Sequence, residues 1–308
     1  MSAFIFPGQG SQSVGMLEDI LEANPSAAAL FAEADDLLGI DLSGIVRADP
    51  EGVLGQTEIT QPALLTASVA LWRLWQSSGG QIPQAMAGHS LGEYSALVCA
   101  GSIDFPTAIK LVRLRGQAMQ AAVGAGDGAM AAILGLDDDV VVAACEAVPG
   151  IVSAANFNSP GQVVIAGEAE AVDSAIKACT DAGAKRAMKL EVSVPSHCAL
   201  MKPAAENLSQ ALDNIEIKAP EIPVFQNVDA QSTADPAKIR ANLVAQLFQP
   251  VQWSRCVLAL KASGLDQMFE CGPGRVLAGL SRRIDRSITM HTLGTLESFT
   301  SALDKSTA

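Results

Sequence analysis

The stretch Gly88-His89-Ser90-Leu91-Gly92 constrains this chain most, because it joins a predicted strand directly to a predicted helix. The strand is the short apolar run 85–87, and the helix covers the small residues 91–100. A strand that turns at once into a helix strains the residue between them, and glycine on either side removes Cβ atoms that would clash. The pattern is typical of the G-x-S-x-G nucleophile elbow, with Ser90 projecting from the turn and the amide of Leu91 directed at an oxyanion.

Two glycines around a serine also have a purely structural explanation. In that alternative, Ser90 only caps the helix after a glycine-flanked turn. The catalytic interpretation needs a strand before the motif and a helix after it, and the sequence predicts both. The sequence therefore favours Ser90 as a nucleophile, which requires a general base elsewhere in the chain.

The composition excludes several classes of protein. Of the 308 residues, 49% are hydrophobic but only 4% are aromatic, which favours tightly packed α/β layers of small apolar side chains. A net charge of −13 argues against a nucleic-acid binder, which needs a basic surface. We expect neither a signal peptide nor a membrane span. The six cysteines form no C-x-x-C pair, so we expect reduced, buried thiols and a cytoplasmic protein.

The first predicted strand, 3–6, runs into a glycine-rich loop at residues 7–12, Pro-Gly-Gln-Gly-Ser-Gln. A dinucleotide fingerprint, G-x-G-x-x-G, would need glycine at the position of Ser13. We expect instead that the glycines let the backbone and Gln9 approach another loop closely, such as the elbow.

Arg115 lies within the apolar face of a helix predicted over residues 106–122. Its neighbours at helical spacing are Ala108, Leu111, Val112, Ala118, Met119 and Ala122. A cation on such a face snorkels to the surface, pairs with an internal carboxylate, or binds an anionic ligand, and the pattern leaves all three open. Arg113 has more polar neighbours and is expected to face solvent.

A different order of elements follows the flexible junction at residues 124–128. Strands are predicted at 129–134, 151–156, 162–167 and 185–190, and helices at 138–148 and 168–182. This β-α-β-β-α-β order is ferredoxin-like, with residues 158–161 as the hairpin turn. We therefore expect a small ferredoxin-like domain, 125–191, inserted into a discontinuous, hydrolase-like α/β catalytic domain. That large domain is expected to comprise residues 1–124 and 192–308 around a mainly parallel sheet.

His197 is the candidate base, because it follows Ser90 in the nucleophile–base order of hydrolase-like folds. Of the other histidines, His89 is held within the elbow and His291 lies in a polar C-terminal segment. A lone histidine is more often structural, but elimination and position favour His197. The sequence does not choose a third, acidic member among the aspartates of the interval, which are Asp104, Asp137, Asp138, Asp139, Asp173 and Asp181.

Further helices are predicted near 17–24, 26–38, 201–212, 237–247 and 275–284, and further strands at 224–228 and 267–270. The last helix ends in three basic residues, Arg282, Arg283 and Arg286. They form a local positive patch on an acidic protein, or simply a solvated helix end that the helix dipole favours.

Four motifs together resemble the malonyl-CoA:acyl carrier protein transacylases of fatty-acid synthesis. They are residues 6–12, residues 88–96, Arg115-Gly116 and the Val-Pro-Ser-His of residues 194–197, and the similarity covers essentially the whole chain. The resemblance implies an acyltransferase that moves a malonyl group from coenzyme A to the phosphopantetheine thiol of acyl carrier protein. It also implies a serine-ester intermediate.

The resemblance assigns a role to each candidate residue. Ser90 is the nucleophile and His197 its base, while Arg115 binds the malonyl carboxylate. The amides of Leu91 and Gln9 form the oxyanion hole.

In this family a main-chain carbonyl, rather than an acid, orients the histidine, and the matching residue here is Gln246. The chemistry implies no metal and no tightly held cofactor. The expected partners are malonyl-CoA and acyl carrier protein, with no nucleic acid and no membrane, and we expect a monomer.

Two other functions share part of this pattern. A serine hydrolase would use Ser90 and His197 but pass the acyl group to water; Arg115 disfavours it, because a neutral ester offers nothing to a guanidinium. A non-catalytic binding module has only the glycine-rich first loop in its favour.

Overall fold

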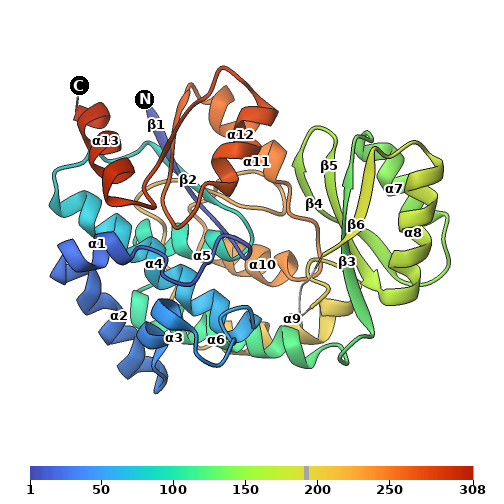
Figure 1. The fold of residues 1–308 in the computed structure, drawn as a ribbon, viewed down its shortest axis with the longest axis horizontal. Helices are drawn as coiled ribbons and strands as arrows, with labels where there is room; N and C mark the ends of the chain where they lie inside the picture. The colour runs from blue at the N-terminus through green and yellow to red at the C-terminus, as the bar shows by residue number, and fades with distance from the viewer. Residues whose placement is uncertain (191–193, 308) are drawn as a thin grey trace.

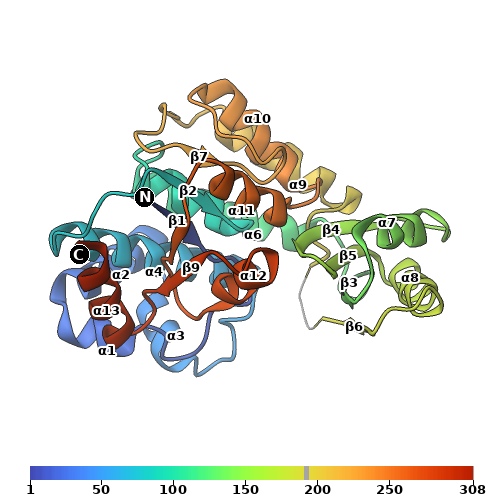
Figure 2. The ribbon, with the colours of Figure 1, turned by 90° about the horizontal axis from the view of Figure 1, so that it is seen from above.

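The computed structural model describes residues 1–190 and 194–307 as an α/β fold with two separate sheets (Figure 1). The predicted junction between residues 191 and 192 lies outside the described residues. Seen from above, the smaller sheet and its two helices lie at one end of the molecule, apart from the larger sheet (Figure 2). Among the described residues, no helix combines the length and the hydropathy that a bilayer crossing requires.

The larger sheet is parallel throughout and has the order β7-β2-β1-β8-β9. Its strands are β1 (Ser2–Phe6), β2 (Ala85–Gly88), β7 (Val224–Phe225), β8 (Gln267–Glu270) and β9 (Thr289–Thr292). Parallel strands end at the same edge of a sheet, so the loop after β1 meets the loop after β2. The predicted mainly parallel sheet is confirmed.

Side chains of β1 alternate between two cores, as the two-residue period of a strand requires. Phe4 and Phe6 enter the core on one face, and Ala3 and Ile5 enter the core on the other. The first face is covered by α2 (Pro25–Leu38), α4 (Thr57–Ser77), α5 (Leu91–Cys99), α6 (Phe105–Ala121) and α9 (Lys202–Leu212). The second face is covered by α11 (Trp253–Ala262) and α12 (Val276–Ile284). The other helices are α1 (Glu18–Ala23), α3 (Leu42–Ala48), α10 (Pro236–Gln246) and α13 (Leu296–Thr307).

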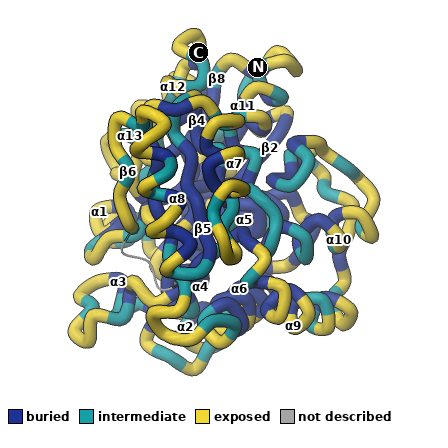
Figure 3. Tube along the Cα trace, turned by 90° about the vertical axis from the view of Figure 1, so that its right-hand side faces the viewer, coloured by how far each residue is buried: buried dark blue, intermediate teal, exposed yellow. Residues whose placement is uncertain are grey.

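The smaller sheet is antiparallel and has the order β4-β5-β3-β6. Its strands are β3 (Gly128–Leu134), β4 (Val152–Ser159), β5 (Gln162–Glu168) and β6 (Arg186–Lys189). One face packs on α7 (Asp138–Glu146) and α8 (Ala169–Asp181), whose outer sides are exposed (Figure 3). The opposite face carries Met130 and Val164 and packs against Cys198, so it is turned toward the rest of the chain.

Several sequence predictions were wrong in detail. β4 continues to Ser159, so Asn158 lies in a strand rather than in the turn. β7 ends at Phe225, because the side chain of Gln226 and the backbone amide of Asn227 both donate to Glu93 instead of continuing the strand pairing. His291 lies in β9, where backbone pairing with β8 places it opposite Phe269 despite the polar surroundings in sequence. Arg113 is half-buried and donates to the carbonyl of Leu38 at 2.7 Å.

Candidate active site

Ser90 lies between the end of β2 and the start of α5, with φ 52° and ψ −108°. This left-handed φ is strained for any residue with a side chain. A Cβ atom on Gly88 would lie 1.9 Å from the backbone of Gly92, and one on Gly92 would lie 2.0 Å from the carbonyl oxygen of Phe6. Both glycines are therefore required by close backbone approach, which is why the sequence pattern was informative.

The glycine-rich loop after β1 packs directly on this turn. A Cβ atom on Gly8 would lie 2.4 Å from the carbonyl oxygen of His89. The backbone amide of His89 donates to the carbonyl oxygen of Phe6 at 2.9 Å. The predicted close approach of the two loops is therefore present. Gln9 and Leu91 both line the pocket in front of Ser90.

His197 contacts Ser90 with one ring nitrogen and the chain of α10 with the other. Nε2 lies 2.8 Å from Ser90 Oγ, and Nδ1 lies 2.6 Å from the carbonyl oxygen of Gln246. A carbonyl only accepts, so Nδ1 carries the proton and Nε2 is free to accept from the serine hydroxyl. Among the described residues, no carboxylate is hydrogen-bonded to this ring, so none of the six candidate aspartates acts there.

The surroundings hold His197 in its neutral form. Its side chain is only 3% exposed. The pKa of the imidazole is lowered to about 3, mainly by burial. The charges of Arg115 and His89 also lower it, whereas the hydrogen bond to Gln246 raises it. A neutral imidazole is the form that can accept the serine proton.

Arg115 enters the same pocket from α6 and is 1% exposed, so it does not snorkel. Nη1 donates to Gln61 Oε1 at 2.8 Å, and Nη2 donates to Gln246 Oε1 at 3.0 Å. Nη2 also lies 3.3 Å from Ser90 Oγ. No described carboxylate forms an ion pair with this guanidinium. Of the three explanations for a cation on the apolar face, an anionic ligand beside Ser90 fits best.

The pocket in front of Ser90 has a volume of about 270 Å³ and is lined by both parts of the chain. Sequence reasoning missed the polar lining residues of the smaller sheet, Asn156 and Asn158 of β4 and Gln162 of β5. His89 Nε2 lies 2.8 Å from Asn158 Oδ1, which ties the elbow to β4. Two asparagines separated by one residue in a strand point to the same face, and that spacing was the available signal.

Sequence reasoning also missed the polar groups behind Ser90, which centre on Glu93 and Asn227. The amide of Ser90 donates to Asn227 Oδ1 at 2.7 Å, and Asn227 Nδ2 donates to the carbonyl of Gly88 at 2.7 Å. Glu93 is completely buried. A glutamate in the first turn of a helix of otherwise small and apolar residues was the available signal for it.

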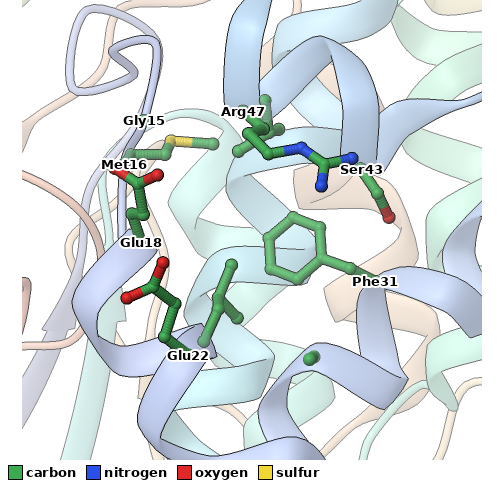
Figure 4. A pocket seen from close by; sticks show the side chains of 10 residues that line it. Gly15, Met16, Glu18, Glu22, Phe31, Ser43 and Arg47 are labelled. Carbon is green, nitrogen blue, oxygen red and sulfur yellow. The ribbon is translucent and has the colours of Figure 1, made fainter.

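A second cavity, of about 260 Å³, lies between α1, α2 and α3 (Figure 4). Phe31 forms part of its wall, and Glu18, Glu22 and Arg47 stand around it. It shares no lining residue with the Ser90 pocket. Within residues 1–190 and 194–307, no group of three metal-ligating side chains is close enough to hold an ion.

Comparisons with known proteins agree on one family. The acyl transferase domain model matches residues 3–286. The malonyl CoA-acyl carrier protein transacylase of Salmonella typhimurium is 54% identical over 303 residues, 98% of each chain. The enzyme of the same name from Escherichia coli K12 is 55% identical over 304 residues, again 98% of each chain.

Solved structures give the same result. A malonyl-transacylase in complex with a type II PKS acyl-carrier protein superposes with a TM-score of 0.97 at 54% identity, covering 98% of this chain and 99% of that one. The malonyl-CoA:acyl carrier protein transacylase of Xanthomonas oryzae superposes with a TM-score of 0.97 at 51% identity, covering 99% of both chains.

Proposed function

Because this chain belongs to the acyl transferase family, and within it to the malonyl-CoA:acyl carrier protein transacylases, we propose that Ser90, His197 and Arg115 perform malonyl transfer. The enzyme moves a malonyl group from coenzyme A to the phosphopantetheine thiol of acyl carrier protein and so supplies fatty-acid synthesis. The observation that carries the residue assignment is the buried guanidinium of Arg115, 3.3 Å from the oxygen of Ser90.

The reaction runs through an ester on Ser90. His197 Nε2 takes the hydroxyl proton as Ser90 Oγ attacks the thioester carbon, and the C–S bond breaks as the imidazolium returns that proton to the departing thiol. The phosphopantetheine thiol then gives its proton to the same nitrogen and attacks the ester, and Ser90 leaves as the hydroxyl. The carbonyl of Gln246, 2.6 Å from Nδ1, keeps the ring in the required tautomer and stabilises the imidazolium.

The amides of Leu91 and Gln9 are proposed to bind the oxyanion formed in both steps. Leu91 begins α5, and its amide and the helix dipole favour negative charge beside Ser90. Gln9 comes from the facing loop, which the close contact at Gly8 holds against the elbow. Removing one such donor typically slows an acyl transfer about 100- to 1000-fold.

Arg115 distinguishes this function from general ester hydrolysis. A guanidinium offers a carboxylate two parallel hydrogen bonds, and the malonyl group keeps its charge throughout the reaction. A neutral acyl group would leave that buried charge without an anionic partner. The arrangement therefore favours an anionic acyl group over the substrates of a general esterase.

One assay separates the three functions that the sequence left open. Malonyl-CoA is supplied with and without carrier protein, and both free coenzyme A and acylated carrier are followed. A transacylase releases coenzyme A in step with acylated carrier. Steady release without carrier would indicate a hydrolase, and no release in either case a binding module.

We further propose the finer division of the fold. Residues 125–191 would form an inserted ferredoxin-like domain, and residues 1–124 and 192–308 the discontinuous catalytic domain. The β-α-β-β-α-β order and the sheet order β4-β5-β3-β6 support this division. The φ of Ser90 and the tight packing at Gly88 support the assignment of residues 88–92 as a nucleophile elbow. A cytoplasmic location and a monomeric state stay predictions; the six free, buried cysteines support the first.

The imidazole of His197 should remain neutral in the folded protein down to about pH 5. Its pKa is lowered from 6.5 to about 3, so between those values the unfolded chain binds more protons than the folded one. The stability that this group contributes is complete above pH 6.5 and is lost as the pH falls toward 3. An NMR titration of the histidine rings measures this directly, with the signal assigned by its loss in His197→Gln. A titration midpoint of His197 near the ordinary histidine pKa of 6.5 would contradict the lowered pKa.

Exposed basic residues near the pocket are expected to dock the acidic carrier protein. Arg283 donates to Gln162 at 2.6 Å, and Gln162 lines the Ser90 pocket, so the end of α12 borders its mouth. Reversing Arg282 and Arg286 to glutamate should raise KM for the carrier about tenfold, more than KM for malonyl-CoA. For the wild type, KM for the carrier should rise with salt.

The matched control reverses Arg47 and Lys110, which are exposed and do not line the Ser90 pocket. The control changes net charge equally, so it should alter KM for the carrier much less. Equal effects of the two pairs would mean that only net charge matters and that docking occurs elsewhere.

A further inference from the structure

Glu93 is a completely buried carboxylate in the first turn of α5, and its three hydrogen-bonding partners are all uncharged donors. Oε2 accepts from the amide of Asn227 at 2.7 Å and from Gln246 Nε2 at 3.0 Å. Oε1 accepts from Gln226 Nε2 at 3.1 Å. Burial raises the pKa of this carboxyl to about 7, against these three hydrogen bonds and the charge of Arg115.

Two of these partners hold the reacting groups. Asn227 bonds both the amide of Ser90 and the carbonyl of Gly88 through its side chain. Gln246 donates from Nε2 to the carbonyl of Ser90 at 3.1 Å and accepts from Arg115 at Oε1. Its main-chain carbonyl meets His197. Glu93 is thus connected to Ser90, His197 and Arg115 through only one intervening residue in each case, either Asn227 or Gln246.

We infer that Glu93 is a positioning residue for acyl transfer. Through Asn227 and Gln246 it holds Ser90, His197 and Arg115 in their relative positions. An ionised carboxylate can only accept, so it fixes which end of the Gln246 amide faces it. With Nε2 directed at Glu93, Oε1 must face Arg115. The same contact anchors residue 246, whose carbonyl orients the histidine. This inference rests on the proposed function of Ser90 and His197.

Glu270, the last residue of β8, provides a matched control. It is also completely buried, accepts from the amides of Leu277 and Ala278 at 3.0 and 2.8 Å, and has a pKa raised to about 7. It caps α12 and has no hydrogen bond to the groups around Ser90. Replacing either glutamate by glutamine keeps the shape and turns one acceptor into a donor.

The experiment compares Glu93→Gln with Glu270→Gln at about pH 8, where both carboxyls are mainly ionised. Acylation of Ser90 is followed by rapid-quench mass spectrometry with malonyl-CoA and with p-nitrophenyl acetate, a neutral ester that does not need Arg115. Glu93→Gln should slow both reactions about 10- to 100-fold, as loss of an orienting partner does elsewhere. Glu270→Gln should change both less than about threefold, although thermal unfolding shows a similar loss of stability.

Three outcomes would count against the inference or its premise. Equal rates for the two variants with both reagents would overturn it. Loss of malonyl transfer alone in Glu93→Gln would overturn it too, because Glu93 would then act only on the charge of Arg115. A wild type that malonyl-CoA does not acylate would contradict the proposed function instead. If Glu93→Gln does not fold, Asn227→Ala is subject to the same criteria, since it deletes the bonds to Ser90 and Gly88.

Discussion

Replacing Arg115 by alanine should invert the acyl preference of the enzyme. The malonyl carboxylate would then enter a buried pocket without a cation, at a cost of about 3–5 kcal/mol, or roughly 100- to 5000-fold in rate. An acetyl group loses no contact there and no longer lies beside a desolvated guanidinium. Malonyl transfer should therefore fall by orders of magnitude, while acetyl transfer is unchanged or rises.

The deciding quantity is kcat/KM for malonyl-CoA over that for acetyl-CoA, measured for the wild type and for Arg115→Ala. Arg115→Lys should give an intermediate ratio, because it keeps the charge but loses the second parallel hydrogen bond. If Arg115 contributed only to packing, kcat/KM for both substrates and the thermal stability of the protein would fall together. An unchanged ratio would therefore remove Arg115 as the group that binds the carboxylate.

Replacing Ser90 by alanine should abolish the acyl-enzyme, with a loss of turnover on the order of a millionfold, as for other serine nucleophiles. The fold should survive, because Ser90 is only half-buried and alanine bears the same backbone strain at φ 52°. Intact-protein mass spectrometry after brief exposure to malonyl-CoA should show a malonyl adduct on the wild type alone. An adduct of equal yield on Ser90→Ala would place the ester on another residue.

Local features of the site could be predicted from the sequence because they depend on neighbours in the chain. The turn at Ser90 needs glycine two residues before and after it, and a Cβ atom at either position would collide with backbone. The place of Arg115 on an apolar helix face follows from the spacing of apolar residues along one helix. The parallel sheet follows from strands that alternate with helices.

Partners that lie far apart in the chain were decided only by the tertiary structure. The helical pattern by itself left three explanations for Arg115, and the structure places this residue beside Ser90, with Gln61 and Gln246 rather than a carboxylate. The residue-by-residue argument left six aspartates open for His197, because nothing in a sequence pattern indicates that a main-chain carbonyl fills that place.

The positions of Asn158 and Glu93 show the same limit. The sequence predicts a turn at Asn158, because asparagine favours turns locally. In the fold, pairing with β5 extends strand β4 past this residue, and the Asn158 side chain contacts His89. Glu93 lies in the motif of residues 88–96, but sequence reasoning assigned it no role, because its hydrogen-bonding partners follow it by more than 130 residues. Periodicity and local propensity determine the elements and their buried faces. Hydrogen bonds between distant segments leave no periodic signal, so only the folded chain determines which groups meet.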